Sequence, residues 1–153
     1  MLELRYINQI KMKKLMMMSA LVATIWFSAS AQKIDASKVP AAVQASFAKQ
    51  FPGAVAKWEK EDGKFEAGFK KDGNTMSALF EANGTMTESE MDIKVADLPA
   101  AVLSYVKDHY KGKSIKEGAK ITKADGTVNY EAEVDGKDVI FDANGKFLKE
   151  MKG

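Results

Sequence analysis

The sequence predicts an α+β protein made of two tandem units, each a helix plus a four-stranded antiparallel sheet, with both helices on one face of a curved sheet. The segments 80–84 (FEANG) and 141–145 (FDANG) are nearly identical, and each places Asn-Gly after a strand-like run. Asn-Gly is a strong hairpin signal, because both central residues of a type I′ turn need a positive φ. A second matching pair precedes them, VPAAV at 39–43 and LPAAV at 98–102. Two copies of one unit explain both pairs.

The first 31 residues have the features of a secretory signal peptide. Three lysines within 11–14 precede an almost wholly apolar run of 13 residues at 15–27, and the small residues at 29–31 offer a cleavage point. A membrane-spanning helix needs about 20 apolar residues, so this run is too short to be an anchor. We therefore expect residues 1–31 to be removed and the mature chain to be exported, without membrane insertion.

The charge balance outside this leader argues against nucleic acid as a partner. The chain has 23 Lys and Arg against 21 Asp and Glu, and four of these bases and one acid lie in residues 1–31, which leaves 19 bases and 20 acids. Binding to nucleic acid needs a concentrated basic face, whereas acids and bases alternate here. The absence of cysteine excludes disulfides and thiol catalysis. The leader starts at Met1 or at Met12, of which Met12, followed by two lysines, is the more natural start.

The first unit is predicted over residues 32–94 and begins with a helix. Apolar residues recur every four positions from Val39 to Phe51, as on one face of an amphipathic helix. Asp35 or Ser37 is a candidate N-cap, and a Pro-Gly pair ends the helix. Four strand-like runs follow, joined by two Asp-Gly turns and one Asn-Gly turn: 55–61, 64–71, 74–81 and 85–92.

The second unit is predicted over residues 95–153 and repeats this order. The same apolar spacing runs from Leu98 to Tyr110, with Asp97 as the candidate cap. Its strand-like runs are 115–124, 127–134, 137–142 and 146–151.

Alternation along the strands predicts one buried and one open face of the sheet. Phe65, Ala67 and Phe69 share one side, whereas Glu66 and Lys70 lie on the other. One helix per unit is enough to cover one face of four short strands. The other face is therefore expected to be open to water or to a partner.

These features together resemble the PepSY-like family of small exported bacterial proteins. The resemblance rests on the signal peptide, the helix starts at 39–43 and 98–102, the Asp-Gly and Asn-Gly hairpins and the tandem arrangement, and it covers the whole mature chain. That family is similar in fold to the beta-lactamase inhibitor protein. The resemblance implies a periplasmic, non-enzymatic binding or inhibitory module whose concave sheet face meets its partner. It carries over no catalytic or ligand residues, because the matching positions are turns and core.

We expect no enzyme, since no set of catalytic residues stands out. His109 is the only histidine and is predicted near the end of the second helix, where its cation would meet the helix dipole favourably. The acids Glu88 with Glu90, and Glu131 with Glu133, lie two residues apart on strands. Such pairs suit acid–base catalysis in a cleft, and they suit solvated strand faces equally well.

Calcium is the other chemistry that the sequence suggests. Asp142-Ala143-Asn144-Gly145 matches part of an EF-hand loop. The remaining ligand positions of such a loop are missing, however, and a hairpin turn explains the segment without a metal. We therefore predict no cofactor and no metal ligands, with calcium as the open alternative.

Apolar residues out of phase with the predicted core mark a candidate partner-binding face. On the open side of the sheet they would lie among charged residues, as an anchor within a polar rim does at protein interfaces. The alternative is that the sheet twists and these residues complete the core. The predicted face comprises Trp58, Glu66, Lys70, Leu79, Glu131, Glu133 and Ile140.

The sequence thus favours an exported, non-enzymatic binding module. Its predicted partner is another exported protein, contacted through the open sheet face, with inhibition or regulation of a hydrolase as one role. The alternative function is a sensor in the cell envelope that responds to calcium or to a small ligand.

Overall fold

The structure, a computed structural model, describes residues 32–152, so the predicted signal peptide at 1–31 lies outside the described residues. Its helical segments are η1 (Ala36–Lys38), α2 (Ala41–Gln50), η2 (Val95–Asp97) and α3 (Ala100–His109). Its strands are β1 (Gln32–Ile34), β2 (Lys57–Glu61), β3 (Lys64–Lys71), β4 (Asn74–Phe80), β5 (Met86–Ile93), β6 (Ile115–Lys123), β7 (Val128–Val134), β8 (Lys137–Asp142) and β9 (Phe147–Lys152). The strand that the sequence did not predict is β1, which pairs with β2.

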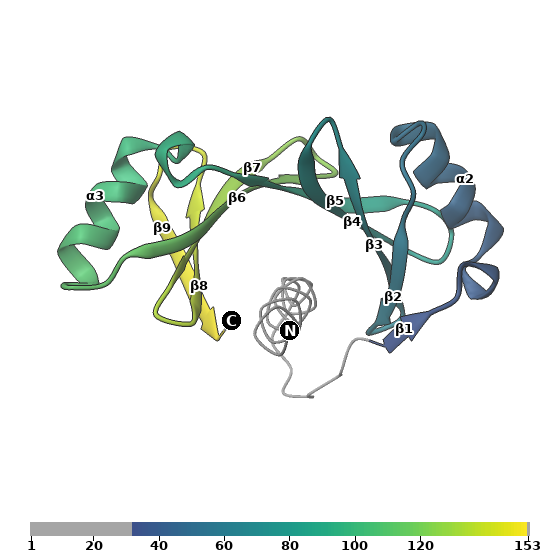
Figure 1. Cartoon of the computed structure of the whole chain (residues 1–153), viewed down its shortest axis with the longest axis horizontal. Coiled ribbons are helices and arrows are strands. Elements are labelled where there is room, and N and C mark those ends of the chain that lie inside the picture. The colour runs from purple at the N-terminus through teal and green to yellow at the C-terminus, as the bar shows by residue number, and fades with distance from the viewer. Residues whose placement is uncertain (1–31, 153) are drawn as a thin grey trace, which may run out of the picture.

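The strands form a nine-stranded sheet in which each strand lies beside its neighbours in sequence. Every pairing is antiparallel. Figure 1 shows the sheet bent into an arch, with α2 and α3 on its convex side and neither of them on its concave side. Among the described residues, no helix is both long and apolar enough to cross a membrane.

Both α-helices begin directly after a proline rather than after the predicted caps. Pro40 and Pro99 occupy the N-cap positions without a side-chain hydrogen bond. Asp35 instead caps η1, because its Oδ1 accepts a hydrogen bond of 2.9 Å from the backbone N–H of Ser37. Asp97 lies within η2. A proline at a helix start has a suitable φ and no N–H to satisfy, and Asp35 instead serves the short turn before it.

Three of the four predicted Asp-Gly turns are type I′ hairpins, whereas at Asp125-Gly126 only the glycine has a positive φ. Asp62, Asp72 and Asp135 have φ values of 48°, 51° and 55°, and the glycine after each also has a positive φ. At the Asn-Gly corners the prediction is wrong, because only Gly84 and Gly145 have a positive φ. These longer loops are type I turns followed by a left-handed glycine.

The two Asn-Gly corners have equivalent surroundings. A Cβ atom at Gly84 would lie 2.6 Å from the carbonyl oxygen of Ala42, and one at Gly145 would lie 2.7 Å from the Cβ of Ala101. Ala42 and Ala101 are both in the first turn of a helix. A register shift adjoins each corner, with one extra residue, Thr87 or Leu148, in the strand that follows it. Each corner therefore packs closely against the helix of its own half, which requires glycine.

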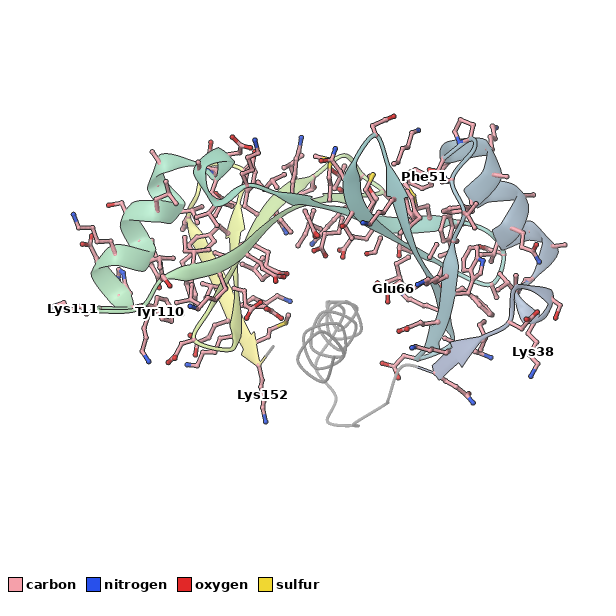
Figure 2. The ribbon with its side chains drawn as sticks, viewed as in Figure 1. Lys38, Phe51, Glu66, Tyr110, Lys111 and Lys152 are labelled. Carbon is pink, nitrogen blue, oxygen red and sulfur yellow. The ribbon has the colours of Figure 1, made fainter. Side chains whose placement is uncertain are left out.

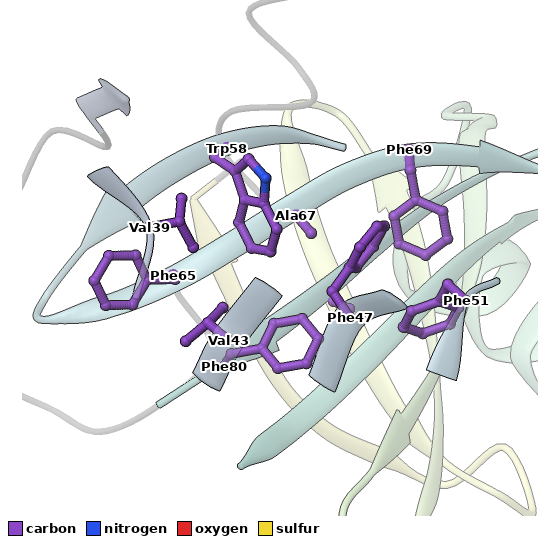
Figure 3. Close-up of a cluster of buried hydrophobic side chains, with 10 residues drawn as sticks. Val39, Val43, Phe47, Phe51, Trp58, Phe65, Ala67, Phe69 and Phe80 are labelled. Atoms are coloured by element: carbon purple, nitrogen blue, oxygen red, sulfur yellow. The ribbon is translucent and has the colours of Figure 1, made fainter. Parts of the chain in front are cut away.

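An aromatic cluster forms the core between α2 and the first strands (Figure 3). The ring of Phe47 lies 5.4 Å from Trp58, 5.0 Å from Phe69 and 6.4 Å from Phe80, in each case edge to face. Such contacts contribute about 0.5–1.5 kcal/mol each beyond the burial of apolar area.

A second cluster lies beneath α3 and is built mainly from aliphatic residues. Val102 and Val106 of the helix pack with Val139 and Phe141 of β8. The one sheet is thus anchored by two separate cores on its convex side.

Candidate binding face

The concave face of the sheet collects side chains that pair across strands. Cross-strand partners of antiparallel strands project from the same face. The rows that cross the middle of this face are Glu66, Leu79, Glu88 and Lys123; Ser77, Glu90, Ile121, Asn129 and Asp142; Asp92, Ala119, Glu131, Ile140 and Lys149; and Glu117, Glu133, Asp138 and Met151.

Carboxylates dominate the middle of these rows, although they are far apart in sequence. Glu90, Glu131 and Asp138 are buried, with 4%, 4% and 5% of their surface exposed. Because the sheet curves toward this face, side chains of neighbouring strands converge there, and Figure 2 shows Glu66 directed to the same concave side. We name the central group the acidic cluster: Glu88, Glu90, Asp92, Glu117, Glu131, Glu133 and Asp138.

The electrostatics of the cluster favour neutral carboxyl groups. Burial, and after it the charges of Asp138 and Glu133, raise the pKa of Glu131 to about 8. Burial, and after it the charge of Glu131, hold the pKa of Glu90 well above its ordinary range. Both causes disfavour the ionised form. Glu131 therefore keeps its proton through neutral pH.

Lysines at the margin of the cluster partly compensate its negative charge. Burial raises the pKa of Glu88, while Lys123 directly across the strand and Lys149 oppose this increase. Burial also raises the pKa of Asp92, helped by the charge of Glu117. The face thus has an acidic middle with lysines beside it.

Two buried oxygens of the cluster have no hydrogen-bond partner within residues 32–152, Glu90 Oε1 and Glu131 Oε2. A buried acceptor without a partner costs about 1–3 kcal/mol. Ile121 and Ile140 in the same rows are fully buried and pack together with Met151, so this face accommodates apolar side chains. Stability alone therefore does not favour acids at these positions.

Trp58 does not lie on the open face where the sequence placed it. It pairs with Ala67 on the helix side of the sheet, is 7% exposed and contacts Phe47. The prediction failed because the tight Asp62-Gly63 turn fixes the register of β2 against β3, which puts Trp58 in phase with the core.

The other predicted residues share the concave side, and their role as partner contacts stays a prediction. Lys70 is exposed and Leu79 half-buried, whereas Ile140 is fully buried beneath the acidic cluster. These six residues are Glu66, Lys70, Leu79, Glu131, Glu133 and Ile140. Sequence reasoning missed the burial of Glu90 and Asp138. For Glu90 the available signal was its spacing of two residues from Glu88, which places both on one face of a strand.

The segment that suggested calcium forms a closed turn. Asp142 Oδ1 accepts hydrogen bonds of 2.8 and 2.9 Å from the backbone N–H groups of Asn144 and Lys146. Across the described part of the chain, no group of three or more His, Cys, Asp or Glu side chains is arranged to hold a metal ion. Calcium binding stays a prediction.

Stacked rings and a hydrogen bond on the convex side of the sheet join α3 to β9. The ring of His109 stacks 3.9 Å from that of Tyr105, which also stacks on Phe147 at 5.1 Å. The hydroxyl of Tyr110 donates a 2.5 Å hydrogen bond to Glu150. Burial, and after it this hydrogen bond, raise the pKa of Tyr110 to about 12. These contacts fasten the last strand to the end of the helix.

The family model of beta-lactamase-inhibitor-like, PepSY-like proteins matches the chain in two regions, residues 22–84 and 63–149. The two matches share residues 63–84, so they do not divide the chain at residue 94. No curated protein matches the chain.

Several solved structures have a similar fold. A BLIP-like protein from Bacteroides fragilis is 25% identical, with a TM-score of 0.62 over 74% of this chain and 86% of that one. A protein from Bacteroides eggerthii, assigned provisionally to the periplasm, is 16% identical, with a TM-score of 0.68 over 74% and 88% of the two chains. A protein from Bacteroides uniformis is 19% identical, with a TM-score of 0.67 over the same shares. The last two likenesses concern the fold alone.

Proposed function

We propose that this chain, which belongs to the beta-lactamase-inhibitor-like, PepSY-like family, is an exported, non-enzymatic module that binds another periplasmic protein through the concave face of its sheet. One observation carries this proposal. Both α-helices pack on the convex side, so the concave side presents rows of charged and apolar side chains that neither helix covers (Figure 1). A curved sheet of this kind can enclose a protruding segment of a partner.

Three further observations support the details of the proposal. The predicted leader at 1–31 favours export. The BLIP-like description of the relative from Bacteroides fragilis favours inhibition or regulation of a hydrolase. The acidic cluster and the only histidine lie on opposite sides of the sheet, since His109 is on α3, and this separation argues against acid–base catalysis.

Site-specific photocrosslinking tests the proposed surface. Benzoylphenylalanine replaces Leu79, which is half-buried on the concave face, and in a matched variant it replaces Lys49, which is exposed on α2. Illumination of cells that export each variant should link a periplasmic protein to the Leu79 variant and none to the Lys49 variant. Capture at Lys49 alone, or at neither position, contradicts the proposal.

Calcium sensing is the second candidate function, and the position of Asp142 in the same concave row as Glu90 favours it, although no three acidic side chains among residues 32–152 are arranged to hold an ion. Carboxylates are the preferred ligands of calcium, and a bound ion would relieve their mutual repulsion. Calorimetric titration should then show micromolar binding of calcium that Asp142→Ala abolishes. Binding that survives this substitution contradicts the sensor that the sequence suggests.

We infer also that residues 32–94 and 95–153 are two copies of one unit. The equivalent packing of Gly84 against Ala42 and of Gly145 against Ala101 supports this inference, as do the register shifts beside both corners. The two corners differ only in Glu81 of the first and Asp142 of the second. If they are interchangeable, Glu81→Asp should leave the midpoint of urea unfolding unchanged. A clear loss of stability would count against the duplication.

A further inference from the structure

Glu90 and Glu131 lie on either side of β6, at the centre of the concave face. Glu90 pairs with Ile121, and Glu131 pairs with the adjacent small residue on the same face, Ala119. Burial, and after it the charge of Glu131, raise the pKa of Glu90, so the two carboxyl groups are close enough to interact. Each side chain is buried, and each has one oxygen without a hydrogen-bond partner in the described part of the chain.

What this arrangement lacks is a positively charged group that can donate hydrogen bonds. Two acids buried side by side repel each other when ionised, and each orphan oxygen loses the hydrogen bonds that water would provide. A guanidinium or ammonium group offers N–H donors and a compensating charge in one group. An anion would add to the repulsion, and no carboxylate set within residues 32–152 is arranged to coordinate a metal ion.

The surroundings of the two acids fit a polypeptide better than a free amine. Leu79 and Met151 add partly buried apolar surface to the concave face. Lys123 and Lys149 lie in its rows, where they would repel a free polyamine. A protein segment can present one cation to the centre together with apolar and acidic groups to the margin.

We propose that Glu90 and Glu131 receive an arginine or lysine side chain from a polypeptide partner that lies on the concave face. This inference rests on the proposed function, since it names what the binding face recognises. Binding must be linked to the loss of a proton, because Glu131 is neutral in the free protein and must ionise to pair with the cation.

Other charged groups on the packed strands will modulate this titration. They comprise Glu66 of β3, Glu88 and Asp92 of β5, Glu117 and Lys123 of β6, Glu133 of β7, Asp138 and Asp142 of β8, and Lys149 of β9. The acids strengthen the attraction for a cation, whereas the two lysines weaken it.

Calorimetry with a short peptide that carries one arginine flanked by leucine and glutamate tests the proposal on the exported protein. At constant ionic strength the affinity should increase up to tenfold per pH unit between pH 6 and 8, as expected when one proton must leave. Titrations at pH 7 in phosphate and in Tris should differ in heat, because the released proton is taken up by the buffer. Glu90→Gln and Glu131→Gln should each weaken binding at least tenfold, and each should also reduce the pH dependence, since each removes one buried acid that must ionise.

Control measurements separate the alternatives. Asp108→Asn removes one negative charge from the exposed surface of α3 and should change the affinity less than twofold. Circular dichroism checks that both glutamine variants are folded. Absence of peptide binding, or equal binding by all variants, overturns the proposal. Calcium or spermidine that binds as tightly as the peptide, with the same sensitivity to Glu131→Gln, also overturns it.

The proposed function can stand when this inference fails. If the Leu79 crosslink captures a partner and Glu90→Gln and Glu131→Gln leave that capture intact, the concave face binds its partner without the acid–cation contact. If no partner is captured while the peptide binds as expected, the cation site exists and the proposed function is contradicted.

Discussion

Replacement of Glu131 by glutamine should stabilise the protein, and the gain should depend on pH. Glutamine keeps the shape of the side chain but cannot ionise. In the folded chain the pKa of Glu131 is about 8, whereas its ordinary value is 4.5. Between these values the folded state retains a proton that the unfolded state releases, so the stability of the wild type falls as pH rises.

The size of this effect follows from the two pKa values. Stability is lost at about 1.4 kcal/mol per pH unit once pH exceeds the ordinary value. Relative to pH 4.5 the loss reaches about 3 kcal/mol at pH 7 and up to about 5 kcal/mol at pH 9, where both states are ionised. The Glu131→Gln variant escapes this loss, so its advantage over the wild type should grow by these amounts.

Urea unfolding at several pH values measures this advantage. Trp58 is the only tryptophan in the described chain and lies in the first core, so its fluorescence reports unfolding. The difference in unfolding free energy between variant and wild type should increase from pH 5 to pH 8 and then level off. Asp108→Asn, an exposed change on α3, should give a difference that does not vary in this range. A Glu131→Gln difference that is equally flat would refute the reasoning.

Two other predictions follow from contacts on the convex side. Gly84→Ala and Gly145→Ala should each lower the unfolding free energy by about 2–4 kcal/mol, because the new methyl group meets a helix and the backbone keeps a positive φ. Gly73→Ala, where no atom lies within 4 Å, should cost about 1 kcal/mol in the same urea assay. Spectrophotometric titration should show a pKa of about 12 for Tyr110, and Glu150→Gln should shift it toward 10. An unchanged titration would mean that the hydrogen bond does not form.

The repeated turns made much of the fold predictable from sequence. The type I′ turn needs two residues with positive φ, and three Asp-Gly pairs meet this need and set the hairpins at Asp62, Asp72 and Asp135. The four-residue spacing from Val39 to Phe51 likewise identified the buried face of α2. These features depend on local geometry, which is why the sequence alone reveals them.

The candidate site was less predictable because it depends on pairing between distant strands. Glu90 and Glu131 are 41 positions apart in the chain, and only the register of β5, β6 and β7 brings them together. Their spacing from Glu88 and Glu133 is equally typical of a solvated strand. Trp58 was misplaced for a related reason, since its phase depends on its register with Ala67.

The protonation of Glu131 in the free protein tests the central claim most directly. Carbon-13 NMR of glutamate labelled at the carboxyl carbon, assigned with Glu131→Gln, follows the resonance of this group as pH is raised. We expect a titration midpoint near 8 for Glu131, which would establish a buried neutral acid on the concave face. A midpoint near 4.5 would show a solvated carboxylate there and would contradict the claim that this face is prepared for a cation.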